Sequence, residues 1–264
     1  MTYQDVLYEV DGPSAVITIN RPQRLNAFRS QTIEELIHAF KRAWADNSVR
    51  ALILTGAGDR AFCVGGDVKQ RAETGDYGPS GNGLFEVTYF HRVIRDVPKP
   101  VIAAVNGLAI GGGHVLHVLC DLSIAAEHAT FGQAGPRVGS FDGGFGSAYL
   151  ARVVGEKRAR EIWFLLDQYT AADAERWNLV NKVVPGSELL AAAKEWGTRM
   201  AGYSPTALRF LKASFNADTD HQAGLSQLSM AGLDTFAQTD EAKEGAVAFV
   251  EKRAPDFGRY FKSH

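Results

Sequence analysis

The stretches AIGGGHVLHVLCD (residues 109–121) and AFCVGGD (residues 61–67) share one plan, in which an apolar run leads through a glycine cluster into a polar or helical pattern. Glycine tolerates positive φ and allows another group to approach the backbone closely. Amides at the start of a helix lack an intrahelical acceptor and lie at the positive end of its dipole. Two such turns that face each other would offer two N–H donors to one developing oxyanion. The alternative is that each cluster is only a tight strand-to-helix turn.

Apolar runs elsewhere in the chain predict an α/β fold. VLYEV (6–10) and AVITIN (15–20) flank an Asp-Gly-Pro turn, which is typical of a hairpin. ALILTG (51–56), PVIAAVNG (100–107) and LSIAA (122–126) are nearly continuous apolar runs, as in strands that are buried on both faces. Because such strands alternate with helical patterns, we expect a mainly parallel core.

An amphipathic helix is predicted over residues 30–47. Its apolar positions Ile33, Leu36, Ile37, Phe40 and Trp44 recur at helical spacing.

The rest of the chain divides into a loop and a helical end. Residues 73–83, ETGDYGPSGNG, predict a mobile loop of the kind that often covers an active site. After residue 185 helical patterns dominate, and Ser204-Pro205 and Thr239 are expected at helix starts.

Composition excludes several classes of function. The chain has 264 residues, 45% hydrophobic and 22% charged, as expected of one large globular domain or a core with an appendage. A net charge of −2 gives no electrostatic argument for binding nucleic acid or an anionic membrane. The sequence lacks a membrane-spanning apolar run and a secretory pattern, so we expect a cytoplasmic location. Cys63 and Cys120 lie in apolar settings and are interpreted as reduced core thiols.

Several familiar site motifs are absent from the sequence. It contains no phosphate-binding G-x-x-x-x-G-K-[ST] loop, no dinucleotide G-x-G-x-x-G after a strand and no G-x-S-x-G nucleophile elbow. His114 and His117 are three residues apart on the predicted helix, a spacing that would suit a metal. No acidic residue accompanies them on that face, so we expect packed histidines and no metal site.

A glycine-rich segment over residues 131–155 contains a single acid, Asp142. A lone carboxylate among small residues suits a proton-transfer group whose pKa is set by its surroundings. An ordinary Asp-Gly turn is the alternative interpretation.

FCVGGD, AIGGGH, FGQAGPRVGSFDGG and EKRAREIWFL together resemble the crotonase superfamily, which acts on acyl-CoA thioesters. The resemblance runs from Val6 to Phe261. It implies a spiral of ββα units (residues 1–200) that holds the acyl-CoA site, followed by a helical region (201–264) that helps to form trimers, often stacked as hexamers. It further implies that the amides of Gly66 and Gly112 form the oxyanion hole for a thioester enolate.

Enoyl-CoA hydratases of this superfamily carry two glutamates where this chain has Val115 and Gly135. Two carboxylates normally share the work of activating water and delivering a proton, and neither Val nor Gly can do so. We therefore do not expect simple hydration by the usual route.

The chain is most similar to the branch that contains 1,4-dihydroxy-2-naphthoyl-CoA synthase and 2-ketocyclohexanecarboxyl-CoA hydrolase. GGGHVLH, VGSFDGGFGS and REIWFL resemble the synthase, whereas GDYGPSGNGL and RDVPKPVIA are closer to the ring-opening hydrolase. Both enzymes act on a carbon–carbon bond next to a thioester by Claisen- or Dieckmann-type chemistry. Three functions are left open: this chemistry on a cyclic acyl-CoA, a hydratase or isomerase that uses Asp142, and a non-catalytic acyl-CoA-binding protein.

The resemblance also implies roles for single residues. Asp142 would move protons at the reacting carbons, and Ser140 would bind substrate beside it. We expect burial next to Phe141 to raise the pKa of the Asp142 carboxyl. Where both enzymes have a Tyr, this chain has Ala237, and Tyr77 or Tyr260 could replace it.

Binding residues follow from the same resemblance. CoA, as part of the substrate and with no tightly bound cofactor, would lie near Arg24, Ala27, Phe28 and Lys69.

Relatives with Gly at the Gly135 position are thought to hold a bicarbonate in place of a side-chain base. Gln133 and Trp163 match its expected ligands, whereas Ala134 replaces the Thr and lacks its hydroxyl.

Overall fold

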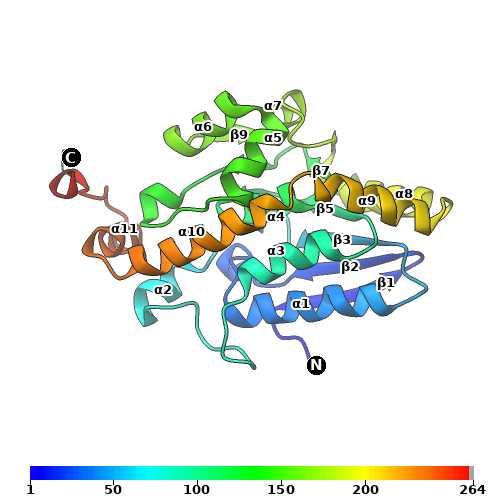
Figure 1. Cartoon of the computed structure of the whole chain (residues 1–264), viewed down its shortest axis with the longest axis horizontal. Helices are drawn as coiled ribbons and strands as arrows, with labels where there is room; N and C mark the ends of the chain where they lie inside the picture. The colour runs from blue at the N-terminus through cyan, green and yellow to red at the C-terminus, as the bar shows by residue number, and fades with distance from the viewer. Residues whose placement is uncertain (262–264) are drawn as a thin grey trace.

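The computed structural model describes residues 1–261, and its strands form two sheets (Figure 1). The larger sheet has the order β1 (Val6–Asp11), β2 (Ser14–Ile19), β3 (Ala51–Gly56), β5 (Val101–Val105), β7 (Leu122–Ala126) and β10 (Lys182–Val184). The smaller has the order β4 (Ala61–Cys63), β6 (Leu108–Ile110), β8 (Thr130–Gly132) and β9 (Gln168–Thr170). The β1–β2 and β8–β9 pairs are antiparallel, and the other pairs are parallel.

Eleven α-helices connect and cover these sheets over the described part of the chain. They are α1 (Ser30–Ala45), α2 (Val68–Thr74), α3 (Val87–Asp96), α4 (Gly112–Leu119), α5 (Leu150–Val154), α6 (Glu156–Leu165), α7 (Ala171–Arg176), α8 (Leu189–Ala201), α9 (Pro205–Ala217), α10 (His221–Ala237) and α11 (Asp240–Glu251). None of the helices within residues 1–261 has both the length and the apolar character needed to cross a bilayer.

The chain repeats one path through the two sheets. β3 lies in the larger sheet, β4 in the smaller, and α2 follows; β5, β6 and α4 repeat this order. β7 and β8 make the same step before a short 3₁₀ turn at Gly135–Val138. The predicted spiral of ββα units is therefore confirmed.

The larger sheet buries both faces, as its apolar strands predicted. On β3, Leu52 and Leu54 belong to the main core with residues of α1 and α3, which lie side by side (Figure 1). Ile53 between them belongs to a second cluster with Leu189 and Ala193 of α8. The alternation follows from the period of two in a strand.

The hairpin, the apolar strands and the helical C-terminal region are confirmed, with one correction in α1. Ile33, Leu36, Ile37 and Phe40 are buried as predicted, but Trp44 is 41% exposed. Trp44 lines a surface hollow instead of the core, which leaves its ring partly in solvent.

Buried polar residues confirm two further predictions. Cys63 and Cys120 are buried free thiols. His114 and His117 pack together with ring centroids 4.9 Å apart, and Nδ1 of His117 lies 3.2 Å from the Ser123 hydroxyl. Burial lowers the pKa of His114 to about 4.

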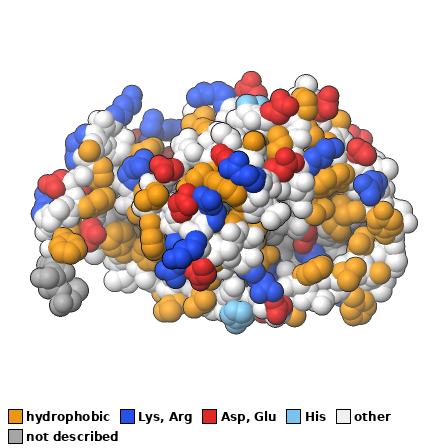
Figure 2. All heavy atoms as spheres, turned by 90° about the horizontal axis from the view of Figure 1, so that it is seen from above, with side chains coloured by type: hydrophobic (Ala, Val, Ile, Leu, Met, Phe, Trp, Pro, Cys, Tyr) orange, Lys and Arg blue, Asp and Glu red, His pale blue; other side chains and the backbone are white. Residues whose placement is uncertain are grey.

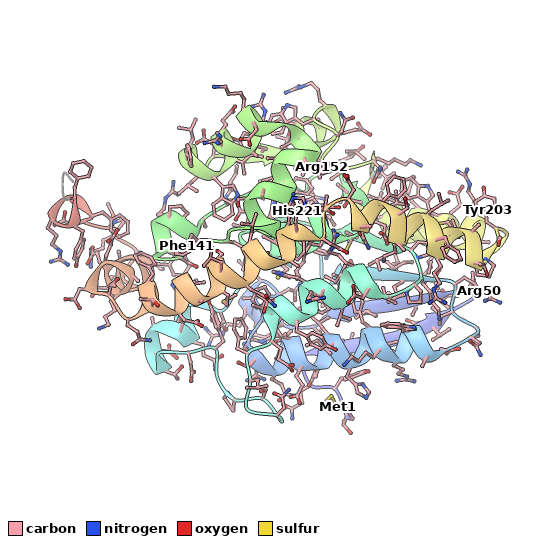
Figure 3. All side chains as sticks on the ribbon, viewed as in Figure 1. Met1, Arg50, Phe141, Arg152, Tyr203 and His221 are labelled. Carbon is pink, nitrogen blue, oxygen red and sulfur yellow. The ribbon has the colours of Figure 1, made fainter. Side chains whose placement is uncertain are left out.

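The C-terminal helices begin where the sequence predicted and are tied to the core. The Ser204 and Thr239 hydroxyls accept the amides of Ala207 and Ala242, which caps α9 and α11. On α9, the buried Lys212 ammonium donates to the Asp121 carboxylate at 2.8 Å. α10 then crosses the molecule from His221 toward the side where Phe141 lies (Figure 3).

The surface carries charges of both signs among apolar side chains, as Figure 2 shows for one face. Exposed apolar residues include Phe164 and Leu165 on α6, and Phe210 and Phe215 on α9. Assembly into trimers or hexamers, and a boundary near residue 200, remain predictions.

Candidate active site

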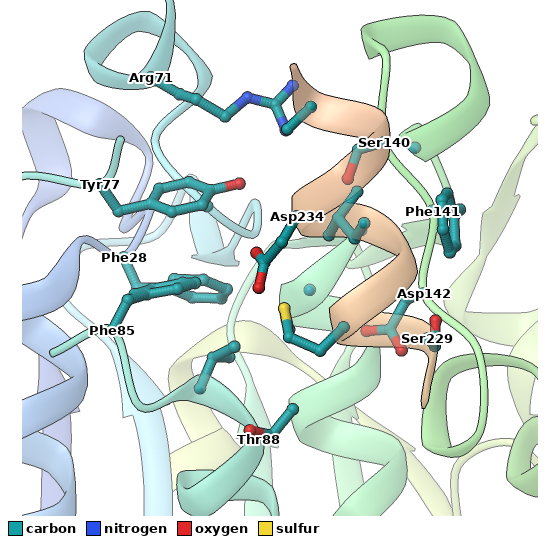
Figure 4. A pocket seen from close by; sticks show the side chains of 18 of the residues that line it. Phe28, Arg71, Tyr77, Phe85, Thr88, Ser140, Phe141, Asp142, Ser229 and Asp234 are labelled. Atoms are coloured by element: carbon teal, nitrogen blue, oxygen red, sulfur yellow. The ribbon is translucent and has the colours of Figure 1, made fainter. Parts of the chain in front are cut away.

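A cavity of about 440 Å³ opens where the two glycine turns meet helix α10 (Figure 4). Its wall contains Gly66, Gly112, Ser140 and Asp142, the four residues that the sequence predicted as catalytic. Residues 61–67, 109–121 and 131–155 therefore converge on one site, together with a C-terminal helix that sequence reasoning did not place there.

The Gly66 amide is left without a bond to Phe28 by the pairing of its two neighbours with that residue. In this parallel bridge, the Phe28 amide donates to the Gly65 carbonyl at 2.8 Å and the Asp67 amide donates to the Phe28 carbonyl at 2.9 Å. Phe28 thus uses the groups on either side of Gly66, so the N–H of Gly66 itself faces away from Phe28. Gly66 lines the cavity with that donor available.

Asp67 holds the turn that carries Gly66. Its carboxylate accepts the Gln70 amide at 3.2 Å and so caps α2. The same carboxylate pairs with the Arg21 guanidinium at 3.0 Å, and both side chains are buried. Asp67, the acid of the GGD motif, therefore fixes both the start of α2 and the position of Gly66.

Gly112 is the first residue of α4, so its N–H has no intrahelical acceptor. Gly111 before it has φ 57°, the left-handed region that glycine adopts readily. Gly65 packs directly against this turn, since a Cβ on Gly65 would lie 2.8 Å from the Gly112 nitrogen. The structure thus brings both glycine turns into contact, with Gly66 and Gly112 in the same cavity wall.

Asp142 lies between this cavity and a second hollow of about 470 Å³. Burial raises the pKa of its carboxyl to about 7, and a hydrogen bond from the Gly146 amide opposes the rise. The rise is the one that the sequence predicted, and Phe141, although 37% exposed, lines both hollows together with Asp142.

The two positions where hydratases carry glutamates offer no acid–base group. Val115 on α4 is 1% exposed, within the apolar core. Gly135 lines the cavity, but a Cβ there would lie 2.8 Å from the Ser140 carbonyl oxygen. The local backbone therefore has no room for a side chain at Gly135.

The residues implied for a bicarbonate do not fit that ion. Gln133 lines the cavity with both of its side-chain polar atoms unpartnered among residues 1–261. The Trp163 indole, however, donates to the Gly146 carbonyl at 2.7 Å, and Ala134 has no hydroxyl. Of the three expected ligands only Gln133 is left to bind the ion, so no step of the proposed reaction uses bicarbonate.

Of the four residues predicted to bind CoA, Phe28 lines the cavity. Arg24 is exposed in the turn Pro22–Arg24, Lys69 is exposed on α2, and Ala27 is buried beside Phe28. None of these three belongs to the described cavity wall, so their contact with CoA remains a prediction.

The cavity also has an aromatic wall. Tyr77 and Phe85 stack with ring centroids 4.3 Å apart, and Phe28 lies 6.2 Å from Phe85. The predicted loop over residues 73–83 thus places the Tyr77 ring against Gly66. A Cβ on Gly66 would collide with this ring. Ala237 lines the same cavity, whereas Tyr260 is not part of its described wall.

Sequence reasoning missed three polar parts of the wall. His91 on α3 is 3% exposed, its Nε2 has no partner among residues 1–261, and burial lowers its pKa to about 4. Asp234 on α10 directs its carboxylate into the cavity (Figure 4). Ser226 and Ser229 on α10 lie beside the Asp142 loop. In the sequence, the only relation among these α10 residues is their helical spacing. That spacing is too weak a signal to assign a site.

Residues 11–260 match the family model described as enoyl-CoA hydratase/isomerase. The chain belongs to this family. It is a crotonase-superfamily protein, whose members act on acyl-CoA thioesters, as the sequence motifs predicted. The match spans both glycine turns, the Asp142 segment and the C-terminal helices.

Three solved structures of the family superpose on 82% to 99% of the chain. An enoyl-CoA hydratase from Mycobacterium avium subsp. paratuberculosis K-10 is 28% identical with a TM-score of 0.85, covering 99% of this chain and 100% of that one. A carnitinyl-CoA hydratase from Mycobacterium avium is 31% identical with a TM-score of 0.83, covering 96% and 98%. A monofunctional enoyl CoA isomerase from M. smegmatis is 34% identical with a TM-score of 0.70, covering 82% and 94%.

Proposed function

We propose that the protein makes or breaks a carbon–carbon bond next to the thioester of a cyclic acyl-CoA. One observation carries the proposal: Asp142, with a pKa raised to about 7, faces the cavity that contains Gly66 and Gly112, while Val115 and Gly135 occupy the positions of the hydratase glutamates. A single carboxylate that exchanges a proton near neutral pH suits one enolate-forming step.

In the ring-opening direction the substrate would be a cyclic β-ketoacyl-CoA. The Asp142 carboxylate removes a proton from water as the water oxygen adds to the ring ketone. The bond between that carbon and the α-carbon then breaks, and its electron pair forms a thioester enolate. Gly66 and Gly112 donate their N–H groups to the enolate oxygen. Protonated Asp142 returns the proton to the α-carbon, which leaves an acyl-CoA with a new carboxylic acid.

Ring closure is the reverse of this sequence and releases water. The pKa of Asp142 favours both roles, because a group that titrates near pH 7 can be a base in one step and an acid in the next.

A second candidate is isomerisation or hydration of an enoyl-CoA with Asp142 as the sole acid–base group. The similarity to the M. smegmatis isomerase supports it. In isomerisation Asp142 would move a proton from one carbon of the acyl chain to another, with no net gain of atoms.

Mass spectrometry of the products distinguishes the candidates. We would incubate the protein with 2-ketocyclohexanecarboxyl-CoA and with straight-chain enoyl-CoAs in ¹⁸O-labelled water. Ring opening places ¹⁸O in a new carboxyl group, hydration places it in a hydroxyl, and isomerisation adds none. An unchanged cyclic substrate beside a converted enoyl-CoA would reject the first proposal. Unchanged substrates throughout, with acyl-CoA bound, would identify a non-catalytic binding protein.

The placement of CoA and the assembly are separate proposals. Charge reversal at both Arg24 and Lys69 should weaken acyl-CoA binding by at least tenfold if these cations meet its phosphates. Sedimentation should give a trimer or hexamer of the 28.7 kDa chain rather than a monomer.

A further inference from the structure

Two serine hydroxyls of α10 hold the loop that carries Asp142. The Gly143 amide donates to Ser229 Oγ at 2.7 Å, and the Phe145 amide donates to Ser226 Oγ at 2.9 Å. The serines are three residues apart, so both lie on the same face of the helix. These two amides belong to the first and the third residue after Asp142.

The fit between helix and loop is close. A Cβ on Gly143 would lie 2.7 Å from Ser229 Oγ, and Gly144 has φ 63° as it packs against Ser226. Ser226 is 6% exposed. A substituted loop residue would therefore displace the loop or the helix.

Helix α10 and the far end of the Asp142 loop are each held by further hydrogen bonds. At the start of α10, the buried Arg95 guanidinium donates to the Asn216 carbonyl and the Thr219 hydroxyl, each at 2.9 Å. At the far end of the loop, the Trp163 indole donates to the Gly146 carbonyl. The serine bonds thus connect a fixed helix to a loop whose other end is also fixed.

Ser229 has a further geometric relation to Asp142. Figure 4 shows both side chains at the edge of the cavity, where Ser229 Oγ accepts the amide of the residue that follows Asp142. A hydroxyl that accepts an amide hydrogen keeps its own hydrogen to donate. The charged and titratable groups that line the two hollows with Asp142 are Arg71, Asp76, Tyr77, His91, Asp234, Glu156 and Arg160.

We infer that Ser226 and Ser229 are positioning residues, through which the C-terminal helix α10 fixes the reacting carboxylate. The inference rests on the proposed role of Asp142. Without either hydroxyl, one loop amide loses its acceptor and the loop moves toward solvent. Asp142 is then less desolvated, and it is displaced from the enolate carbon.

The test uses Ser226→Ala, Ser229→Ala and the double variant in the full chain, with Ser214→Ala as control. Ser214 is an exposed serine of α9 outside the cavity wall. With the acyl-CoA substrate that proves active, we expect kcat to fall about tenfold in each single variant and KM to change less than threefold. The apparent pKa of the kcat/KM profile, which reports the free enzyme, should move down from about 7, while Ser214→Ala keeps wild-type values.

Amide hydrogen exchange gives a readout that does not depend on turnover. Exchange at Gly143 should accelerate at least tenfold in Ser229→Ala, and exchange at Phe145 should do so in Ser226→Ala. Unchanged exchange, or faster exchange with an unchanged kcat and pH profile, would overturn the inference. Asp142→Asn separates the two levels: wild-type turnover in that variant would refute the role of Asp142 itself, whatever the serine variants do.

Discussion

A methyl group on Gly65 would lie 2.8 Å from the amide nitrogen of Gly112, so the two glycine turns touch backbone to backbone. Gly65 has φ 86°, and its neighbour Gly66 supplies one of the two proposed oxyanion donors. The spacing of the two donors is therefore set by a contact that any side chain at Gly65 would enlarge.

Gly65→Ala should lower kcat by at least 10²-fold, because a displaced oxyanion donor costs that much in comparable sites. Gly58→Ala is the matched control, since Gly58 has φ 78° with no atom near its added Cβ. Both variants carry similar backbone strain, about 1 kcal/mol or more. Steady-state kinetics should show a large loss in the first variant only; equal kinetics would mean that the contact does not set the donor spacing.

Asp142→Asn should lower kcat by about 10²-fold or more, the usual scale for a general acid–base group. Binding of acyl-CoA should persist, because the amide keeps the size of the carboxyl. Calorimetry and single-turnover kinetics measure the two effects separately. Asp59→Asn, an exposed aspartate, is the control for loss of one negative charge. Wild-type turnover by Asp142→Asn would make Asp142 a turn residue.

The same variant should change stability in a pH-dependent way. Burial raises the pKa of Asp142 to about 7 in the folded protein, from 3.8. The stability gained from the neutral carboxyl is complete below about pH 4 and is lost as pH rises through 7. Asn does not ionise, so Asp142→Asn should be more stable than wild type at pH 8.5 by on the order of 2–4 kcal/mol. Denaturant unfolding should give a difference of about 1 kcal/mol at pH 4.5 and a severalfold larger one at pH 8.5.

The buried histidines predict the opposite dependence. Burial lowers the pKa of His114 to about 4, from 6.5. Its contribution to stability is complete above 6.5 and is lost as pH falls toward 4, by on the order of 3 kcal/mol. His114→Leu should reduce the loss of stability between pH 6.5 and pH 4, measured by denaturant unfolding. His221→Leu, at an exposed position of α10, should leave that loss unchanged.

The sequence predicted the strands well because short uninterrupted apolar runs are typical of strands that are buried on both faces. Residues 51–56 form β3 with every side chain buried. Trp44 shows the limit of periodicity: it has the spacing of a core residue but lies past the edge of the core. Spacing identifies a helix face, and only the packing of distant segments decides how far along the helix that face is covered.

The sequence singled out Gly66, Gly112 and Asp142, which the structure brings to one cavity, but not the residues of α10 that support them. Gly66, Gly112 and Asp142 belong to glycine-rich segments with recognisable motifs. The desolvation of Asp142 was expected from Phe141, its sequence neighbour, which lines both hollows beside it. Desolvation depends on the walls of two hollows, one of which includes residues of α10 that are more than 80 positions away in the sequence. No local pattern contains that information.

The dependence of the Asp142 loop on α10 has a consequence during synthesis of the chain. A ribosome releases Asp142 well before Ser226 and Ser229, and at ordinary rates of synthesis the delay is on the order of ten seconds. During that interval the nascent chain already holds both glycine turns and the acid, but not the hydroxyls that orient the loop. Activity should therefore begin only after α10 has been made and has docked, rather than when the last reacting group has been made.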